Sequence, residues 1–305
     1  MLSCSRLNYH YGSAHRVRDV SFFVHDGEIL ALFGHNGSGK TTILNMMSGM
    51  APVQSGEIVQ NGHKVLNEKG FLKGHMRASL GIIFQGTSSD EKLTVRDNFR
   101  YAASLMGLSK RNALNAIDAI LETARLVDRA DDKVKNLSGG LRRRMELYRM
   151  FLHEPTLLIL DEPTAGLDVK EAQRFFSFLS HYMEQKRACA VIATHSPEEA
   201  LLCDRVIMLK DGQKILEGNP KDLVGSVPYL RLSVAYERKP PEEELAHVPW
   251  FDVVIDEEKA CIEAKVYQEK MVDILQGPLL NAPWLKSFSQ KNPTLADVYE
   301  GVSEL

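Results

Sequence analysis

The stretch GHNGSGKT, residues 34–41, constrains this chain more than any other feature of its sequence. The apolar run before it, residues 29–33, predicts a buried strand, and the pattern after it predicts a helix. The stretch fits G-x-x-x-x-G-K-[ST], in which glycines let successive backbone N–H groups turn toward phosphate oxygens. The N-terminus of the following helix adds the positive end of its dipole. We therefore expect a phosphate-binding loop between a strand and a helix.

A second motif, LLILDEPT at residues 157–164, predicts an apolar strand that ends on Asp161 and Glu162. Ligands of open α/β sheets bind at the carboxyl ends of the strands. We expect Lys40 to reach the β- and γ-phosphates, and Thr41 and Asp161 to hold Mg²⁺. Glu162 would then be the general base that polarises the attacking water. A strand capped by solvated acids is common by itself, but this reading becomes improbable beside an Mg²⁺-binding loop.

Three further residues are candidates because they lie near the same edge of the predicted sheet. His195 follows the predicted strand 190–194 and can donate a hydrogen bond to the γ-phosphate, although a lone histidine is usually an ordinary structural residue. Gln85 ends another predicted strand, and its amide can orient the water or contact Mg²⁺. Tyr11 can stack on adenine, with neighbouring Tyr9 as the competing candidate and an ordinary surface tyrosine as the alternative.

Taken in order, these motifs closely resemble the ATP-binding subunit of ABC transporters over about residues 2–223. The signature LSGG at residues 137–140 separates that family from other phosphate-loop ATPases, and the D-loop motif follows at residues 165–168. The resemblance assigns nucleotide contacts to Tyr11, Gly34, Asn36, Gly37, Ser38, Gly39, Lys40, Thr41, Thr42, Ser138, Gly139, Gly140 and Asp168. It assigns catalysis to Glu162, His195 and Gln85, and the metal to Thr41, Gln85 and Asp161.

The resemblance also implies a mechanism with ATP and Mg²⁺ as cofactors. Two identical subunits would sandwich two ATP molecules, so that the phosphate loop of one faces the LSGG of the other. Ser138 and Gly140 would contact the γ-phosphate across this interface, and Asp168 would lie at the interface between the sites. ATP closes the homodimer and hydrolysis opens it, which switches a separate transmembrane permease subunit between two states. No nucleic-acid partner is expected.

Two departures and two further similarities bear on the branch of the family. Leu141 stands where the family signature has glutamine, and the D-loop AGLD resembles that of drug and polysaccharide exporters. Residues 91–109 resemble the helix that faces the coupling helix of ABC-2 permeases, and residues 293–303 resemble the ending of daunorubicin-exporter-like ATPases. A plain amphipathic helix and a generic terminal helix are the alternatives. Together these features favour export over import.

Strands that alternate with helices predict a largely parallel sheet with helices on both faces. The family adds an antiparallel β subdomain and a helical subdomain. After about residue 219 the composition changes, and the rest reads β-α-β-β-α-β, the ferredoxin-like order, followed by a closing helix. We expect an α/β ABC ATP-binding domain at residues 1–223 and a small α+β domain at residues 224–305.

The bulk composition limits the remaining functions. A net charge of −3 gives no sign of a general nucleic-acid binder. The four cysteines form no CxxC pair, which suits a reducing compartment. We see neither a signal peptide nor an apolar segment of membrane-spanning length. The expected location is therefore cytoplasmic, at the membrane only through the permease partner.

The competing hypothesis is a soluble ABC ATPase that works in translation or chromosome maintenance. Translation-type members usually carry two cassettes, and this chain has one. Chromosome-type members insert a long coiled coil before LSGG, and no sustained heptads occur here. An inactive regulatory cassette is disfavoured because Lys40, Asp161, Glu162 and His195 are all intact. The transported substrate cannot be read from this chain, because a membrane subunit would recognise it.

Overall fold

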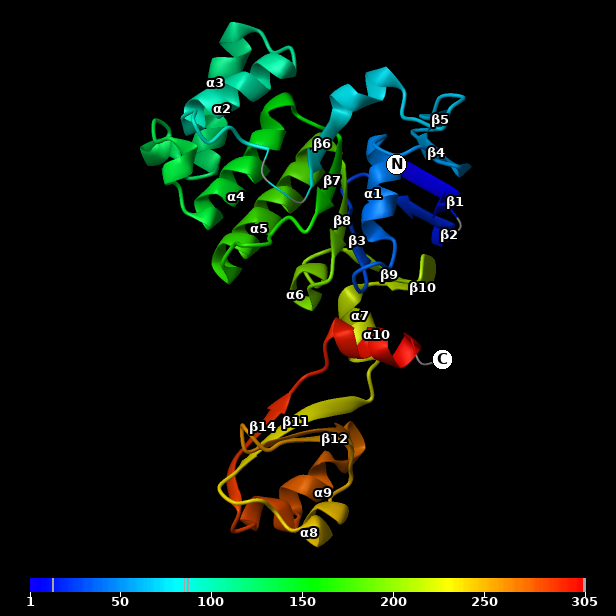
Figure 1. Ribbon diagram of the computed structural model, residues 1–305, viewed down its shortest axis with the longest axis vertical. Helices are drawn as coiled ribbons and strands as arrows, with labels where there is room; N and C mark the ends of the chain where they lie inside the picture. The colour runs from blue at the N-terminus through cyan, green and yellow to red at the C-terminus, as the bar shows by residue number, and fades with distance from the viewer. Residues whose placement is uncertain (13, 85, 87, 304–305) are drawn as a thin grey trace. The chain divides into compact units, whose positions relative to one another are not determined.

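The structure is a computed structural model that describes residues 1–12, 14–84, 86 and 88–303. The chain divides into two compact units, Met1–Pro220 and Lys221–Leu305, shown in Figure 1. The boundary expected from the sequence lay slightly later, after residue 223. Among the described residues, no helix combines the length and the apolar character that crossing a membrane requires.

The central sheet of the first unit has the strand order β10-β9-β3-β8-β7-β6. Its strands are β3 (Ile29–Phe33), β6 (Leu80–Ile83), β7 (Leu157–Asp161), β8 (Cys189–Thr194), β9 (Arg205–Lys210) and β10 (Gln213–Gly218). All pair in parallel except β10, which is antiparallel to β9. Every residue of β3, β7 and β8 is buried, which explains their continuous apolar runs. The predicted parallel sheet is confirmed, and its carboxyl ends meet at one edge.

A second, antiparallel sheet has the order β2-β1-β4-β5, with β1 (Leu2–Tyr11), β2 (Ala14–Val24), β4 (Ser55–Gln60) and β5 (His63–Lys64). Helix α1 (Lys40–Ser48) lies between the two sheets (Figure 1), and one apolar core joins all three. Asn61 and Gly62, both with positive φ, form the hairpin turn between β4 and β5. Strand β1 was not predicted, because a bulge at Arg6, with φ 49°, interrupts its alternation of buried and exposed side chains.

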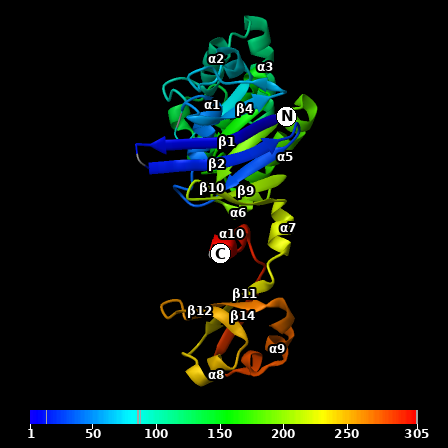
Figure 2. The same cartoon turned by 90° about the vertical axis from the view of Figure 1, so that its right-hand side faces the viewer.

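Helices lie on the other side of the central sheet (Figures 1 and 2). They are α2 (Val95–Leu105), α3 (Lys110–Thr123), α4 (Gly139–Arg149) and α5 (Val169–Lys186), with the short α6 (Pro197–Ala200) beyond β8. Short 3-10 helices occupy Gly74–Ser79, Val127–Arg129, Val134–Asn136 and Met150–His153. Helices α2 and α3 pack mainly on α4 and on the 3-10 helix Met150–His153, rather than on the strands themselves. Between α2 and α3, Gly107 has φ 73°, and Ser109 caps α3.

The second unit begins in α7 (Pro220–Gly225) and contains a four-stranded sheet with the order β12-β13-β11-β14. Its strands are β11 (Tyr229–Tyr236), β12 (Trp250–Asp256), β13 (Cys261–Tyr267) and β14 (Leu285–Lys291). Its helices are α8 (Glu242–Ala246), α9 (Met271–Gln276) and α10 (Leu295–Ser303), with 3-10 turns at Gln268–Lys270 and Pro278–Asn281. The predicted order β-α-β-β-α-β is present, and Trp284 is central to its core.

Asp297 joins α10 to the sheet of this unit. Its carboxylate is buried and accepts hydrogen bonds from Arg231 Nε at 2.6 Å and from the Thr294 backbone N–H at 2.8 Å. Burial raises the pKa of Asp297, but the hydrogen bonds from Thr294 and Arg231 outweigh it, so the pKa lies below its ordinary value. A depressed carboxyl pKa stabilises the fold above the unfolded pKa of about 3.9, and this stabilisation is lost as the pH falls through the folded pKa.

Replacing Asp297 by Asn should therefore lower the urea midpoint for unfolding of this unit at pH 7. The difference in midpoint between the variant and the wild type should become smaller below about pH 4. Tryptophan fluorescence reports on this unit alone, since the only two tryptophans, Trp250 and Trp284, lie in it. Asp273→Asn is the control, because that side chain is exposed and, within the described residues, its ion pair is a long one, with Lys270 at 3.5 Å. An Asp297→Asn midpoint equal to the wild-type value at pH 7 would contradict this account.

Candidate active site

The phosphate-binding loop, residues 34–41, runs from β3 into α1 at the carboxyl edge of the central sheet. Two of its glycines are required by space as well as by conformation. A Cβ on Gly34 would lie 2.3 Å from the carbonyl oxygen of Leu209, and one on Gly39 would lie 2.6 Å from that of Arg16. Gly39 also has φ 104°. The loop is therefore packed closely against β9 and β2, and its shape is fixed by the protein itself.

Lys40 and Ser38 place polar groups inside this loop. The Lys40 ammonium is buried and donates to the carbonyl oxygens of Gly34 at 2.6 Å and His35 at 2.9 Å. Ser38 Oγ is also buried, and among the described residues it has no hydrogen-bond partner. A buried hydroxyl without a partner is costly unless a ligand satisfies it. The loop therefore fits a bound phosphate chain.

Beside the loop, Thr41 Oγ1 donates a hydrogen bond to Asp161 Oδ2 at 3.1 Å. Burial raises the pKa of Asp161, the hydrogen bond from Thr41 opposes the rise, and the charge of Glu162 adds to it. Burial also lowers the pKa of Lys40, while Glu162 and Asp161 oppose that shift. A cation near Asp161 would favour its ionised form.

The oxygens of Thr41 and Asp161 suit Mg²⁺, which prefers oxygen ligands. In the described part of the chain, no cluster of three His, Cys, Asp or Glu side chains can hold a metal ion by itself. This agrees with the way Mg²⁺ is usually bound, by one or two protein groups together with phosphates and water. The residues present therefore fit Mg²⁺ bound together with a nucleotide.

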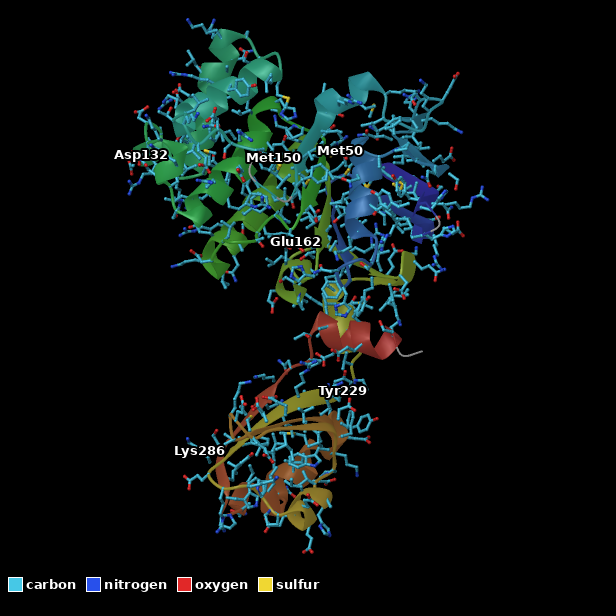
Figure 3. The ribbon with its side chains drawn as sticks, viewed as in Figure 1. Met50, Asp132, Met150, Glu162, Tyr229 and Lys286 are labelled. Atoms are coloured by element: carbon cyan, nitrogen blue, oxygen red, sulfur yellow. The ribbon has the colours of Figure 1, made fainter. Side chains whose placement is uncertain are left out.

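Glu162 follows β7 directly and lies at the carboxyl end of that strand (Figure 3). Its φ of 46° is unusual for a residue other than glycine, and its N–H donates to Ala193 at 2.9 Å. Its carboxylate contacts His195 Nδ1 at 2.5 Å. His195 Nε2 has no hydrogen-bond partner among the described residues. Sequence reasoning brought both residues to this edge but did not predict their contact, which joins the ends of β7 and β8.

A cavity of about 180 Å³ opens in front of the loop. Tyr11 lines it and is 54% exposed, whereas Tyr9 is buried in the core and meets the Tyr11 ring edge-on at 4.8 Å. Tyr11 is therefore the better placed of the two candidates. The other lining residues are Arg16, Asn36, Gly37, Gly39, Lys40, Thr41, Thr42, Asp161 and Glu162. Sequence reasoning missed Arg16, because an exposed arginine on a strand carries no distinguishing pattern.

The signature residues begin α4. Ser138 caps this helix by accepting a hydrogen bond from the Leu141 N–H at 3.3 Å. Gly139 and Gly140 have helical backbones, so conformation does not require glycine there. A Cβ on Gly139 would meet nothing within 4 Å, and one on Gly140 would meet only the Gly166 carbonyl oxygen at 3.4 Å. Within the described chain, nothing requires these two positions to be glycine.

The signature and the phosphate loop of this chain border different cavities. The second cavity, of about 570 Å³, is lined by Leu137 and Gly139 on one side and by Glu162 on another. Glu162 also lines the cavity of the phosphate loop, whereas no signature residue does so among the described residues. The signature thus borders a cavity that shares Glu162 with the phosphate-loop cavity but contains no phosphate-loop residue among the described residues.

Two predicted site residues stand apart from this arrangement. Asp168 caps α5 by accepting a hydrogen bond from the Glu171 N–H at 2.9 Å, and it lines neither cavity. Its expected role at a dimer interface therefore stays a prediction. Gln85, predicted for catalysis and metal binding, lies outside the described residues.

Comparison with known proteins gives consistent findings. Residues 17–165 match the sequence profile of the family described as ABC transporter. The Nod factor export ATP-binding protein I of Rhizobium sp. (strain N33) is 37% identical over 215 residues, which is 70% of this chain and 69% of that protein. The protein of the same name from Rhizobium etli is 33% identical over 243 residues, covering 79% of this chain and 75% of its own.

Two solved structures share the fold. The cbiO1 protein of Clostridium perfringens, part of the ABC transporter complex cbiONQ, is 29% identical with a TM-score of 0.66, over 74% of this chain and 90% of its own. The ATP-binding cassette MJ0796, solved as a dimer in a post-hydrolysis state with ADP and Pi, is 25% identical with a TM-score of 0.63. That match covers 72% of this chain and 98% of the cassette.

Proposed function

Because this chain belongs to the family of ABC transporter ATP-binding subunits, we propose that it powers export through a separate membrane subunit. It is an ATPase that binds ATP with Mg²⁺, as members of this family are. The observation that carries the proposal is the convergence of Thr41, Asp161 and Glu162 beside the phosphate loop. Phosphate contacts, metal ligands and a carboxylate base meet there at one cavity.

Each residue of this cavity has a proposed task. Lys40 and the backbone N–H groups of the loop bind the β- and γ-phosphates, and Tyr11 stacks on the adenine. Mg²⁺, when bound by Thr41 and Asp161, neutralises part of the phosphate charge. Glu162 accepts a proton from the attacking water. His195 contacts the Glu162 carboxylate through Nδ1, and its other ring nitrogen, Nε2, is the proposed contact for the γ-phosphate.

We propose that the working form is a homodimer in which Ser138, Gly139 and Gly140 contact the ATP bound by the other subunit. The bare backbone of Gly139 and Gly140 supports this, since nothing described in their own chain requires glycine. A phosphate that approaches the N-terminus of α4 from outside would need that free space, and the helix dipole would favour it. Leu141, in the place of the family's glutamine, still donates its backbone N–H to Ser138. The signature therefore keeps its helix cap.

We propose that the substrate is exported, and that the chain works at the cytoplasmic face of a membrane through its permease partner. Relatives named as export ATP-binding proteins support this, together with the resemblance of residues 91–109 and 293–303 to exporter ATPases. The substrate itself would be recognised by the membrane subunit.

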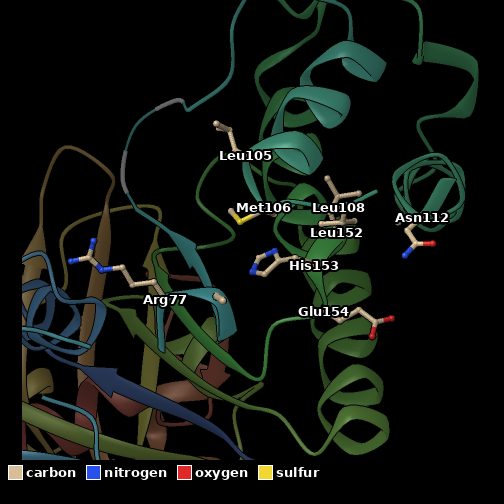
Figure 4. A pocket seen from close by; sticks show the side chains of 10 residues that line it. Arg77, Leu105, Met106, Leu108, Asn112, Leu152, His153 and Glu154 are labelled. Carbon is tan, nitrogen blue, oxygen red and sulfur yellow. The ribbon is translucent and has the colours of Figure 1, made fainter. Parts of the chain in front are cut away.

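A groove on the helical part of the first unit is our proposed docking site for that subunit. It has a volume of about 690 Å³, and Figure 4 shows Leu105, Met106 and Leu108 beside it, with Arg77 across it. Leu105 is 67% exposed and Met106 is 50% exposed, which is unusual for such side chains. The groove suits an amphipathic helix whose apolar face meets the loop after α2 and whose acidic end meets Arg77.

Replacing both Leu105 and Met106 by Glu should abolish capture of the membrane subunit by the tagged chain, because a charged surface cannot bury an apolar helix face. ATP hydrolysis by the isolated chain should be unchanged, since neither residue lines the nucleotide cavity. Affinity capture from detergent extracts, with mass spectrometry of the captured proteins, measures the first result. Leu114→Glu is the matched control, because Leu114 is also exposed on the neighbouring α3 but lies outside the groove.

The same capture experiment separates transport from the alternative function. A captured protein with several membrane-spanning segments supports the transporter, and its loss in the double variant supports the groove. Capture of ribosomal proteins or DNA instead would favour a soluble ABC ATPase. If the variant with Leu105 and Met106 replaced captures the membrane protein as well as the Leu114→Glu control does, the permease docks elsewhere.

A further inference from the structure

Three consecutive arginines follow the signature, and their side chains have different partners. Arg142 pairs with Glu91 at 2.6 Å, and Arg144 pairs with Glu171 on α5 at 2.9 Å. These two are ordinary ion pairs that fix α4 against its neighbours. Arg143 is different, because its closest partners are backbone carbonyl oxygens and not carboxylates.

The Arg143 guanidinium binds the turn that follows β7. Nε donates to the Pro163 carbonyl oxygen at 2.9 Å, and Nη2 donates to that of Glu162 at 2.8 Å, with Asp161 at 3.4 Å. The side chain is only 11% exposed, and its nearest carboxylate, that of Glu146, is 3.9 Å away. Burial lowers the pKa of Arg143, while Glu146 and other carboxylates oppose the shift. The planar guanidinium presents several N–H donors in a fixed fork, so Nε and Nη2 reach two carbonyl oxygens at once.

The turn held by Arg143 carries the proposed catalytic base. Glu162 has φ 46°, a conformation that persists only where surrounding contacts enforce it. On the other side of the turn, Glu199 accepts hydrogen bonds from the Thr164 N–H at 3.0 Å and its hydroxyl at 2.8 Å. The turn is thus fixed from α4 by Arg143 and from α6 by Glu199. Of these two contacts, only that of Arg143 reaches the carbonyl of Glu162 itself.

We propose that Arg143 is a positioning residue, which ties the helix that begins at the signature to the backbone of Glu162. The proposal rests on the function assigned above to Glu162 and to the signature. Ser138 and Arg143 lie on the same rigid helix, about 7.5 Å apart along its axis. When the signature end of α4 engages ATP on the other subunit, Arg143 carries the resulting shift of α4 to the Glu162 of its own site.

Replacing Arg143 by Gln removes the bridge and should lower kcat about 10- to 100-fold, since small misplacements of a catalytic group have effects of this size. The KM for ATP should stay within about twofold, because Arg143 lines the signature cavity and not the phosphate-loop cavity, in which its own chain binds ATP. The milder Arg143→Lys, which keeps the charge but not the fork, should fall between Gln and wild type. Arg144→Gln is the matched control on the same helix, and it should leave kcat much less affected.

A double-mutant cycle tests whether Arg143 acts through Glu162. With Glu162 already replaced by Gln, Arg143→Gln should lower the residual rate by less than about threefold, far from the sum of the two effects. Arg144→Gln should have the same small effect in both backgrounds. Thermal unfolding and nucleotide binding of each variant separate misfolding from misplacement.

The outcomes distinguish this proposal from the function on which it rests. If Glu162→Gln is inactive while Arg143→Gln keeps the wild-type kcat, the positioning role is wrong and the catalytic assignment stands. If Glu162→Gln hydrolyses ATP normally, the assigned function of Glu162 fails first. Arg143 would be a packing residue only if the effects of Glu162→Gln and Arg143→Gln on kcat were fully additive. The same conclusion would follow if Arg144→Gln lowered kcat as much as Arg143→Gln does.

Discussion

Replacing Glu162 by Gln should lower the rate of ATP hydrolysis about 10²- to 10⁴-fold, the range expected when a general base is removed. The amide cannot accept the proton of the attacking water, yet it has nearly the same shape and keeps a hydrogen bond to His195. ATP binding should therefore persist, and the closed dimer should accumulate because it can no longer open through hydrolysis. Single-turnover hydrolysis and size-exclusion chromatography with ATP measure the two effects.

Glu198→Gln is the matched control for this substitution. Glu198 lies on α6 close to His195, where it accepts a hydrogen bond from Ser196, and it lines neither the phosphate-loop nor the signature cavity. Its variant should hydrolyse ATP at the wild-type rate and show no stable dimer. A Glu162→Gln protein that remains active would exclude Glu162 as the base. One that is inactive yet monomeric with ATP would contradict the sandwich dimer.

Replacing Lys40 by Met should lower ATP hydrolysis by about 100- to 1,000-fold, as removal of one preorganised donor to a developing charge does elsewhere. The ammonium is already held inside the loop by the carbonyls of Gly34 and His35, so no reorganisation precedes phosphate binding. Methionine fills the space without the charge. Unlike the Glu162 variant, this protein should also bind ATP weakly, which fluorescence titration with a labelled nucleotide measures.

Lys64→Met is the control for the loss of a lysine charge, since Lys64 is exposed on β5 and pairs with Glu57 at 2.8 Å. It should bind and hydrolyse ATP as the wild-type chain does. The Lys40 variant should unfold somewhat below the wild-type temperature, because methionine cannot donate to the carbonyl oxygens of Gly34 and His35. Normal ATP affinity in that variant would show that the loop binds phosphate without Lys40.

Local sequence predicted the parts of the site that are contiguous in the chain. The spacing of Gly34, Gly39 and Lys40 predicted the loop, because the residues that shape it are neighbours along the chain. The apolar run before Asp161 and Glu162 predicted a buried strand and the edge of the sheet at which it ends.

Contacts between distant segments could not be predicted in this way. The contact of Glu162 with His195 depends on β7 and β8 being neighbours in the sheet, in a register that places Asp161 opposite Ala193. The hydrogen bond from Arg143 to the Pro163 carbonyl oxygen depends on how α4 packs. Three arginines stand in a row in the sequence, and nothing in the sequence distinguishes the middle one. Strand β1 was missed because the bulge at Arg6 breaks its alternation. Register and packing, unlike motif spacing, are properties of the whole fold.

The separation of the phosphate-loop cavity from the signature cavity has a genetic consequence. In the proposed dimer each ATP site takes its two halves from different chains, so a chain with one altered half damages one of the two sites of a mixed dimer and leaves the other site complete. A chain with an altered Lys40 spoils its own loop, but its intact signature still completes the site of its partner. Mutations in the loop and in the signature would therefore complement each other in trans, while either one would be partly dominant over the normal gene.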